Sequence, residues 1–357
     1  METLRIRAGK KALAHIREKG LRAQDVRAVA GAAGGPKWLV LAGLDRFVFG
    51  RFLEGPRRPV HLVGASIGAW RFSAVCRENP VEGTGRLLDA YIHQQYEGKP
   101  SAAQISREGR RIQQKVLSDG AVDNILSHPF FRFNLLSVRC RGPAASESRV
   151  LQGAGMLAGF AANLASRRWL RLFFTRTLFH HPGDPPPFFT RSDGIGVCRV
   201  PLSEKNLAAA LLASGSIPIL MNGQKDVPGA PAGIYRDGGV IDYHMAIPFD
   251  VEDGLVLFPH YMDRTIPGWF DKKRKGRKPD PAFSDRVVRV APSPAFVEAL
   301  PGKKIPDRDD FKIYFGRDTD RFSAWKQVAE KSERLAEVFA EAVESGRIRD
   351  LVQPLSA

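Results

Sequence analysis

Hydrophobic runs that meet glycine-rich turns dominate the first quarter of the chain. An apolar run at 26–30 leads into residues 31–37, with the sequence GAAGGPK, and a second apolar segment follows. The same order returns with an apolar run at 59–63, a turn at 64–68 and an apolar segment at 69–77. Short apolar runs before tight turns are typical of buried strands, and the segments after the turns have the pattern of helices. Two strand–turn–helix units in succession predict a largely parallel sheet that is covered by helices.

Further helices are predicted toward both ends of the chain. Charged and apolar residues follow helical spacing over 9–19, and an apolar helical face runs through 321–344. Between them, residues 80–150 have the pattern of helices and loops, and we expect a helix over 203–213 and an apolar strand over 254–259. No internal repeat of fixed period accompanies these elements.

The composition is that of a globular protein with ample material for a core. Of the 357 residues, 43% are hydrophobic and 26% are charged, which excludes a disordered or fibrous chain. Lys and Arg number 54 against 38 Asp and Glu, which gives a formal net charge of +16. The chain is therefore basic, although its total fraction of charged residues is ordinary. Cys76, Cys140 and Cys198 lie far apart without a CxxC pair, which favours a reducing compartment over a disulfide framework or a zinc finger.

No segment of the sequence has the pattern of a membrane-targeting or membrane-spanning element. The first twenty residues carry charges throughout and lack the apolar core of a secretory signal. The longest uncharged stretch, 207–224, is interrupted by Ser214, Gly215 and Pro218, which a lipid-exposed helix would tolerate poorly. We therefore expect a cytoplasmic protein.

A candidate nucleophile lies in the second of the two turns. Gly64, Ser66 and Gly68 form a GxSxG pattern, in which glycines allow a sharp strand-to-helix turn that presents the serine hydroxyl. The pattern alone is weak evidence, but the predicted strand before it and the predicted helix after it are the context that a nucleophile elbow requires. We favour Ser66 as a nucleophile over the alternative of a merely tight turn.

A serine nucleophile needs a base, and the sequence offers two arrangements. In a dyad, one carboxylate accepts the serine proton directly; Asp237 suits this role because Gly238 and Gly239 leave its flank free for close approach to another loop. In a triad, the acid and histidine candidates are Asp237, Asp242 or Asp250 with His244 or His260. Alternatively, Asp237 and Gly238 form an ordinary Asp–Gly turn with no catalytic role.

The glycine-rich stretch at 31–37 is a candidate oxyanion hole. It follows a predicted strand and opens a helix, so its exposed amides and the positive end of the helix suit a developing negative charge. A phosphate cradle is the alternative, but the chain has neither a GxxxxGK[ST] motif nor a clean GxGxxG motif. A nucleotide site is therefore the weaker prediction.

Four motifs, taken in chain order, resemble those of the patatin-like phospholipase family. They are the loop at 31–37, GASIG at 64–68, ASGSIP at 213–218 and DGGVID at 237–242, and the resemblance covers residues 26–250. The resemblance implies a three-layer α/β/α sandwich with a mostly parallel central sheet, and a Ser–Asp dyad that hydrolyses lipid acyl esters in lipid degradation. No histidine, metal or organic cofactor is needed in that mechanism.

The resemblance also assigns roles to single residues. Ser66 is the nucleophile and Asp237 the general base, and the structural glycines of the two motifs are Gly64, Gly68, Gly238 and Gly239. An α/β-hydrolase-type esterase with a Ser–acid–His triad remains the alternative enzyme.

The chain departs from the family in its glycine-rich loop. The family's loop has three glycines, any residue, Arg and Gly, whereas alanines at 32–33 interrupt the glycines here. Pro36 has no N–H, so the amides of Gly34 and Gly35 are the expected oxyanion donors, with Lys37 in place of the usual arginine. These departures keep a third alternative open, a catalytically silent protein that retains the fold and binds lipid or membrane.

The resemblance divides the chain into three segments. We expect an N-terminal helical extension at 1–24, a patatin-like acyl-hydrolase domain at 25–260, and a C-terminal basic loop and helical extension at 261–357 that packs on the same domain. The expected partner is a phospholipid or another acyl-ester lipid.

The positive charge has three interpretations. It is either solvated surface, or an attraction to anionic membranes through the basic run 272–278 and the aromatic–basic segment 167–174, with Trp169 and Phe173 inserted. The third interpretation, nucleic-acid binding, is not expected because no helix-turn-helix, zinc module or RNA-binding aromatic motif accompanies the charge.

Overall fold

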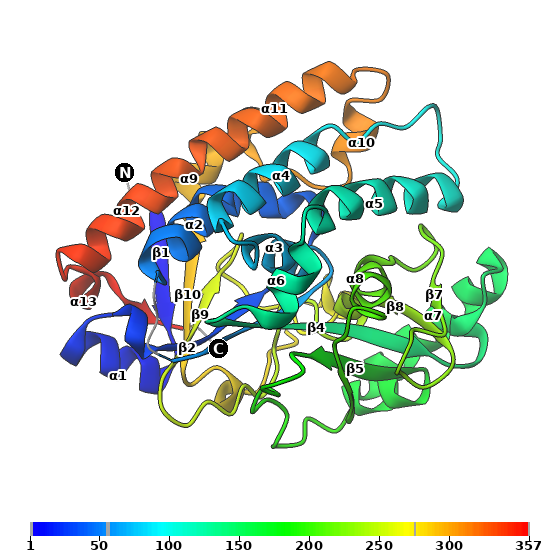
Figure 1. Ribbon diagram of the computed structural model, residues 1–357, viewed down its shortest axis with the longest axis horizontal. Helices are drawn as coiled ribbons and strands as arrows, with labels where there is room; N and C mark the ends of the chain where they lie inside the picture. The colour runs from blue at the N-terminus through cyan, green and yellow to red at the C-terminus, as the bar shows by residue number, and fades with distance from the viewer. Residues whose placement is uncertain (1–2, 55–57, 275, 356–357) are drawn as a thin grey trace.

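An α/β fold surrounds one mostly parallel sheet, as the computed structural model in Figure 1 shows. The structure describes residues 3–54, 58–274 and 276–355. The strands in these residues are β1 (Leu4–Ala8), β2 (Val26–Gly31), β3 (Val60–Ala65), β4 (Phe131–Cys140), β5 (Phe174–His180), β6 (Val197–Pro201), β7 (Gln224–Lys225), β8 (Ile234–Asp237), β9 (Leu255–Pro259), β10 (Val287–Pro292) and β11 (Gln353–Pro354). Their order is β11-β1-β10-β9-β2-β3-β4-β5-β6, and β8 pairs with both β4 and β7.

The centre of the sheet is parallel. β10, β9, β2, β3 and β4 run in one direction, whereas β1 is antiparallel to β10, and β5 and β8 are antiparallel to β4. Every residue of β3, β9 and β10 is buried, as expected for strands that are covered on both faces.

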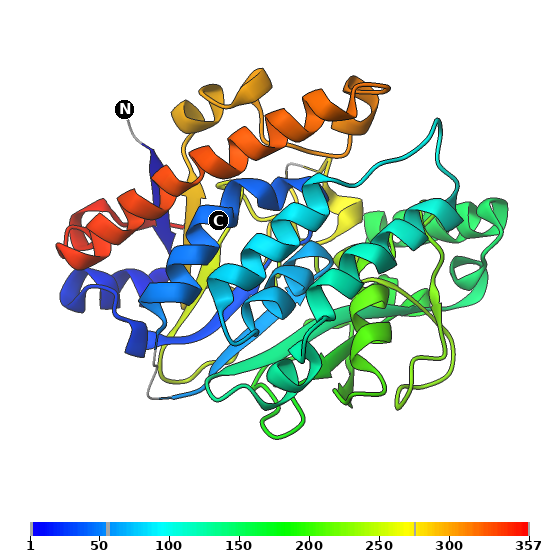
Figure 2. The ribbon, with the colours of Figure 1, turned by 45° about the horizontal axis from the view of Figure 1, so that its top comes forward.

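Helices cover both faces of the sheet. Figures 1 and 2 show α2–α6 over one face, with α1 and α7 on the other. The helices are α1 (Lys10–Lys19), α2 (Ala42–Phe47), α3 (Ile67–Val75), α4 (Pro80–Ile92), α5 (Ala102–Leu117), α6 (Ala121–Ser127), α7 (Arg149–Ala165), α8 (Leu207–Gly215), α9 (Pro294–Glu298), α10 (Asp310–Ile313), α11 (Asp318–Lys331), α12 (Glu333–Glu344) and α13 (Ile348–Leu351). The predicted fold class, an α/β/α sandwich with a mostly parallel central sheet, is confirmed.

The largest difference from the predicted elements is β4. The pattern of residues 80–150 predicts helices and loops, and α4, α5 and α6 agree, but β4 lies in the same stretch and pairs with β3. Arg132, Asn134 and Arg139 interrupt its apolar run. Asn134 is nevertheless buried, because its side-chain amide donates to the carbonyl oxygens of Leu62 (3.2 Å) and Arg132 (2.6 Å).

The single terminal helix predicted over 321–344 is two helices. α11 ends at Lys331 and α12 begins at Glu333. Between them, Ser332 Oγ accepts a hydrogen bond from the amide of Gly43 (2.8 Å), and a Cβ on Gly43 would fall 2.5 Å from the Ser332 carbonyl oxygen. The helix therefore breaks where it packs most closely on α2.

Both ends of the chain complete the sheet. Residues 1–24 contain the predicted helix, α1, but also β1, which the sequence pattern did not indicate. Residues 261–357 contribute β10, which lies between β1 and β9. The two extensions are thus part of the same sheet as residues 25–260, a difference from the segmentation expected from the sequence.

The described helices include none that is long and apolar enough to cross a membrane.

The three cysteines are free, and burial raises the pKa of Cys140 to about 12, which disfavours the nucleophilic thiolate.

Candidate active site

Ser66 lies at a sharp turn between a strand and a helix. β3 ends at Ala65 and α3 begins at Ile67, so the strand–turn–helix context predicted for the GxSxG pattern is present. Ser66 itself has φ 56° and ψ −128°, a conformation that residues with a side chain adopt at a cost of about 1–3 kcal/mol. The turn holds the serine at the carboxyl end of a central strand.

The two glycines of the turn are required by close packing. A Cβ on Gly68 would fall 2.1 Å from the carbonyl oxygen of Gly31, at the end of β2. A Cβ on Gly64 would fall 2.4 Å from the amide nitrogen of Ala69. Since real Cβ atoms do not approach backbone so closely, only glycine fits at both positions.

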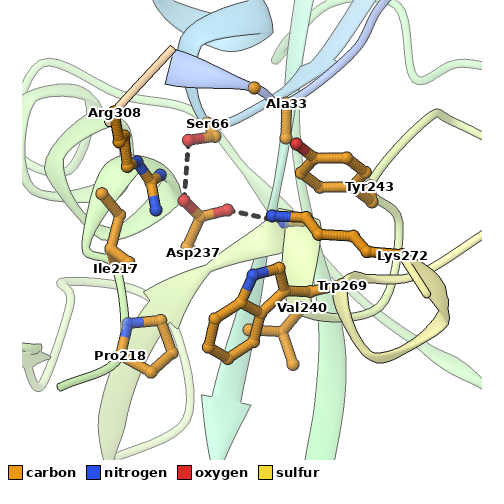
Figure 3. A pocket seen from close by; sticks show the side chains of 12 residues that line it. Ala33, Ser66, Ile217, Pro218, Asp237, Val240, Tyr243, Trp269, Lys272 and Arg308 are labelled. Atoms are coloured by element: carbon orange, nitrogen blue, oxygen red, sulfur yellow. Dashed lines mark hydrogen bonds between the residues drawn. The ribbon is translucent and has the colours of Figure 1, made fainter. Parts of the chain in front are cut away.

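The structure brings Ser66 and Asp237 together, although they lie 171 positions apart in the sequence. Ser66 Oγ donates a hydrogen bond to Asp237 Oδ2 at 2.7 Å, as Figure 3 shows. The amide of Gly239 donates to the other carboxylate oxygen, also at 2.7 Å. The serine and the aspartate are only 5% and 6% exposed, so the contact lies largely out of water.

The glycines after Asp237 allow this approach. A Cβ on Gly238 would fall 2.2 Å from the carbonyl oxygen of Leu136 in β4, and a Cβ on Gly239 would fall 2.8 Å from Cβ of Ala33. The sequence suggested that these glycines allow a close approach to another loop. In the structure, Gly238 packs closely on β4 and Gly239 packs closely on the glycine-rich loop.

The motif at 213–218 connects the two catalytic candidates. Ser214 Oγ accepts a hydrogen bond from the Ser66 amide (2.9 Å) and donates to the carbonyl of Leu136 in β4 (2.7 Å). The carbonyl of Ser216 accepts a hydrogen bond from the amide of Asp237 (3.0 Å). One short segment therefore fixes the backbone of both residues.

The environment of Asp237 favours a stronger base than a free carboxylate. Burial raises the pKa of Asp237, while the hydrogen bond from Ser66, the charge of Arg308, the Gly239 amide and the charge of Lys272 each act to lower it. The net direction is upward. Burial, with the charges of Arg308 and Lys37, lowers the pKa of Lys272 to about 7.

The predicted oxyanion residues take different positions. Gly34 lines the cavity around Ser66, and among the described residues its amide donates no hydrogen bond. Gly35 and Lys37 are not part of the cavity lining. Lys37 Nζ lies over the ring of Tyr261, 5.3 Å from its centre, and burial lowers the pKa of this lysine. Of the three, only Gly34 is placed to contact a ligand at the cavity.

The two histidines of the triad alternative form hydrogen bonds with partners other than Ser66. His244 Nε2 lies 2.7 Å from Tyr261 Oη, and His260 Nδ1 accepts a hydrogen bond from the amide of Met262 (2.9 Å). Both are buried, burial lowers the pKa of each well below its ordinary value, and neither lines the cavity.

The other acid candidates have different partners. Asp242 forms a buried ion pair with Arg176 (2.7 Å), and Asp250 pairs with Arg191 (2.6 Å). Of the acids considered from the sequence, only Asp237 contacts the serine.

Several residues around the cavity had no predicted role in the site. The lining comprises Ala33, Gly34, Ser66, Ile217, Pro218, Asp237, Gly239, Val240, Tyr243, Trp269, Lys272 and Arg308. Trp269, Lys272 and Arg308 belong to the C-terminal segment beyond the resemblance, where no motif marks them. The one sequence signal near them is the basic run at 272–278, which includes Lys272.

The basic run at 272–278 is only partly exposed. Lys272 is half-buried in the cavity wall, and Arg274 and Arg277 donate to a backbone carbonyl at the end of α7 (3.2 and 2.7 Å). Lys275 lies outside the described residues.

The described residues contain no group of three or more His, Cys, Asp or Glu side chains that could hold a metal ion. Comparisons with protein-family models and with curated proteins find no match for this chain.

Proposed function

We propose that the chain is a patatin-like serine acyl hydrolase, a phospholipase or lipid esterase that forms an acyl-enzyme on Ser66 with Asp237 as the general base. The observation that carries the proposal is the 2.7 Å hydrogen bond from Ser66 Oγ to the buried carboxylate of Asp237. The order of the four motifs supports it, since each of them lies at this one site.

The proposed cycle begins when Asp237 accepts the Ser66 proton as Oγ attacks the ester carbonyl. The negative charge that develops on the carbonyl oxygen is stabilised by amides of the 34–37 loop, of which the unpaired Gly34 amide is the best placed, and by the start of α3. After the alcohol or lysolipid leaves, the same aspartate activates water, which releases the fatty acid.

A dyad has more support than a triad. Asp237 accepts the hydrogen bond of the serine directly, whereas His244 and His260 are turned toward other partners. The free Gly34 amide beside Ser66 supports turnover over a catalytically silent lipid-binding protein.

The partner that we propose is an ester lipid in an anionic membrane, on which the protein docks peripherally. The supporting feature is the α7–η5 surface, formed by α7 and the short helix η5 (Arg167–Leu172), where six large apolar side chains are between 45% and 81% exposed. They are Val150, Leu151, Leu157, Leu164, Trp169 and Leu172. Exposed arginines at 149, 168 and 171 lie among them, and this mixture suits lipid tails beneath anionic headgroups.

The α7–η5 surface adjoins the cavity. Gln152 of α7 accepts a hydrogen bond from the amide of Ile219, which is exposed together with Leu220. These two residues directly follow Ile217 and Pro218 of the cavity lining. Phe173, which the sequence placed among the inserting residues, is instead packed against the small apolar cluster that contains Leu170 and Phe174.

The proposal is tested by labelling the intact protein with a fluorophosphonate and locating the adduct by peptide mass spectrometry. We expect one adduct, on Ser66, and a loss of at least about a hundredfold in labelling rate in Asp237→Asn. Asp250→Asn is the matched control, because it removes another acid candidate that contacts Arg191 rather than the serine. His260→Gln should label normally.

Hydrolysis of short-chain esters by the same proteins provides the second measurement. Ser66→Ala should abolish hydrolysis while the protein keeps its circular dichroism spectrum. A folded native protein that neither labels nor hydrolyses esters, or a Ser66→Ala protein with normal turnover, would contradict the proposed function.

A further inference from the structure

Two basic side chains line the cavity and form no ion pair within the described residues. Lys272 and Arg308 both face the Ser66–Asp237 pair in Figure 3. Within the described residues, neither side chain forms an ion pair or donates a hydrogen bond; Lys272 Nζ lies over the ring of Tyr243, 4.2 Å from its centre. Asp237 is the only acid among the described lining residues, and its charge acts on both cations. Two cations that are partly withdrawn from water beside a single carboxylate are costly, which indicates that a further negative ligand group completes the site.

The carboxylates near Arg308 are already engaged. Asp307 and Asp310 both pair with Lys304 (3.0 and 2.7 Å), and Asp309 pairs with Lys312 (3.0 Å). In the turn that carries Arg308, each acid therefore contacts a lysine, two of them the same lysine, and none forms an ion pair with the arginine.

The acids near Lys272 are engaged as well. Asp271 accepts a hydrogen bond from the Asn163 amide (2.8 Å) and lies 3.8 Å from Arg277. Asp237 holds the Ser66 hydroxyl and the Gly239 amide. The cavity wall thus contains two cations and one carboxylate, Asp237, whose two oxygens already accept hydrogen bonds.

Arg308 is held in place although its charged end is unpaired. Asp310, two residues further on, accepts a hydrogen bond from Trp325 Nε1 of α11 (2.9 Å), which anchors the turn. A Cβ on Gly35 would lie only 3.4 Å from Arg308 Nε, so the side chain passes directly over this glycine on its way to the cavity. The glycine-rich loop therefore supports the arginine as well as the oxyanion amide.

We propose that Arg308 and Lys272 bind the phosphate group of the substrate, so that the preferred substrate is a phospholipid whose phosphate lies next to the scissile acyl ester. This inference rests on the proposed function and deepens it. A guanidinium offers a planar set of N–H donors that matches phosphate oxygens, and an ammonium adds a point charge. In a glycerophospholipid the phosphate and an acyl ester occupy adjacent carbons, so one molecule can reach both the cations and Ser66.

The test compares two soluble substrates with identical short acyl chains, a phosphatidic acid and the neutral diacylglycerol, at concentrations below aggregation. We expect the native protein to prefer the phosphatidic acid in kcat/KM by at least about tenfold, and Arg308→Gln to lose most of that preference. Arg308→Lys should recover part of it. Arg317→Gln, which removes an exposed arginine of the same segment, is the charge-matched control and should keep the native ratio.

Binding to Ser66→Ala protein, measured by calorimetry, separates this inference from the proposed function. Saturable binding of the short-chain phosphatidic acid that Arg308→Gln abolishes supports the phosphate site even if no ester is turned over. Inorganic phosphate is tested alongside, and it should bind more weakly than the lipid. A native preference for the neutral substrate, an unchanged ratio in Arg308→Gln, or tighter binding of inorganic phosphate than of the lipid would overturn the proposal.

Discussion

At the scale of single residues, burial decides what the site can do. Asp237 is almost fully covered, and this burial raises the pKa of its carboxyl above the ordinary value of 3.8. A raised pKa makes the carboxylate a better proton acceptor for Ser66, provided that it stays ionised. The nearby charges of Arg308 and Lys272 act in the opposite direction and favour the ionised form.

This balance predicts the pH dependence of serine labelling. The rate should fall as pH decreases through the Asp237 pKa, because a protonated carboxyl cannot accept the serine proton, and the fall should begin at a higher pH than for an exposed carboxylate. Lys272→Met removes a charge that lowers this pKa, so the acid limb should move to still higher pH. The measurement is the second-order rate constant of fluorophosphonate labelling against pH.

Lys273→Met is the matched control for this prediction, because Lys273 is the exposed neighbour and does not line the cavity. Its acid limb should coincide with that of the native protein. An acid limb that stays in place or moves to lower pH in Lys272→Met would contradict the assigned electrostatics.

At the scale of elements, α7 differs from the other long helices. Its exposed apolar residues at 150, 157 and 164 recur every seven residues, so they form a stripe along one face of the helix. η5 continues the surface with Trp169 and Leu172. In the described residues no other element covers this stripe, and the arginines beside it favour an anionic lipid surface over a second, equally basic copy of the chain.

The α7–η5 surface predicts the effect of two substitutions on vesicle binding. Leu157→Asp combined with Trp169→Asp should weaken binding to vesicles that contain anionic phospholipid by roughly tenfold or more, because it removes apolar area and adds like charge. Hydrolysis of a soluble short-chain ester should stay at the native rate. Vesicle co-sedimentation and ester turnover are measured on the same preparations.

The matched control is Val81→Asp, since Val81 is also 41% exposed but lies on α4, over the opposite face of the sheet. It should bind vesicles like the native protein. Equal loss in both variants, or no loss in either, would mean that α7 and η5 do not form the docking surface.

At the scale of the whole molecule, buried and partly buried histidines link stability to pH. Burial lowers the pKa of His61 and His128 to about 4, and it also lowers the pKa of His181, His244 and His260. In the unfolded chain these residues take up protons near the ordinary value of 6.5. The unfolded state therefore binds more protons than the folded state as pH decreases below that value, so the folded state loses stability.

We predict that the free energy of unfolding falls between pH 7.5 and pH 5, by up to about 1.4 kcal/mol per pH unit for each histidine that stays neutral in the folded state. The measurement is urea unfolding at a series of pH values. The carboxylates with lowered pKa, such as Asp193 and Asp250, titrate below this window and do not account for the effect. A flat profile between these pH values would contradict the buried, neutral histidines.

The sequence by itself determined the local features of this protein, those in which residues close together in the chain act together. The turn at 64–68 between β3 and α3 could be predicted because a strand, two glycines and a helix occur together in one short stretch. The role of Gly238 and Gly239 in a close approach could be predicted for the same reason. β4 could not, because polar residues interrupt its apolar run, and one of them, Asn134, is buried with a partner on β3 that the local sequence does not reveal.

Only the tertiary structure decided which distant side chains meet. It joined Asp237 to Ser66, gave His244 and His260 other partners, and brought Lys272 and Arg308 to the cavity from a segment outside the four motifs. It also placed β1 and β10 in the central sheet. The physical reason is that hydrogen bonds and charges act over a few ångströms in space, whereas a sequence pattern records only the few residues on either side.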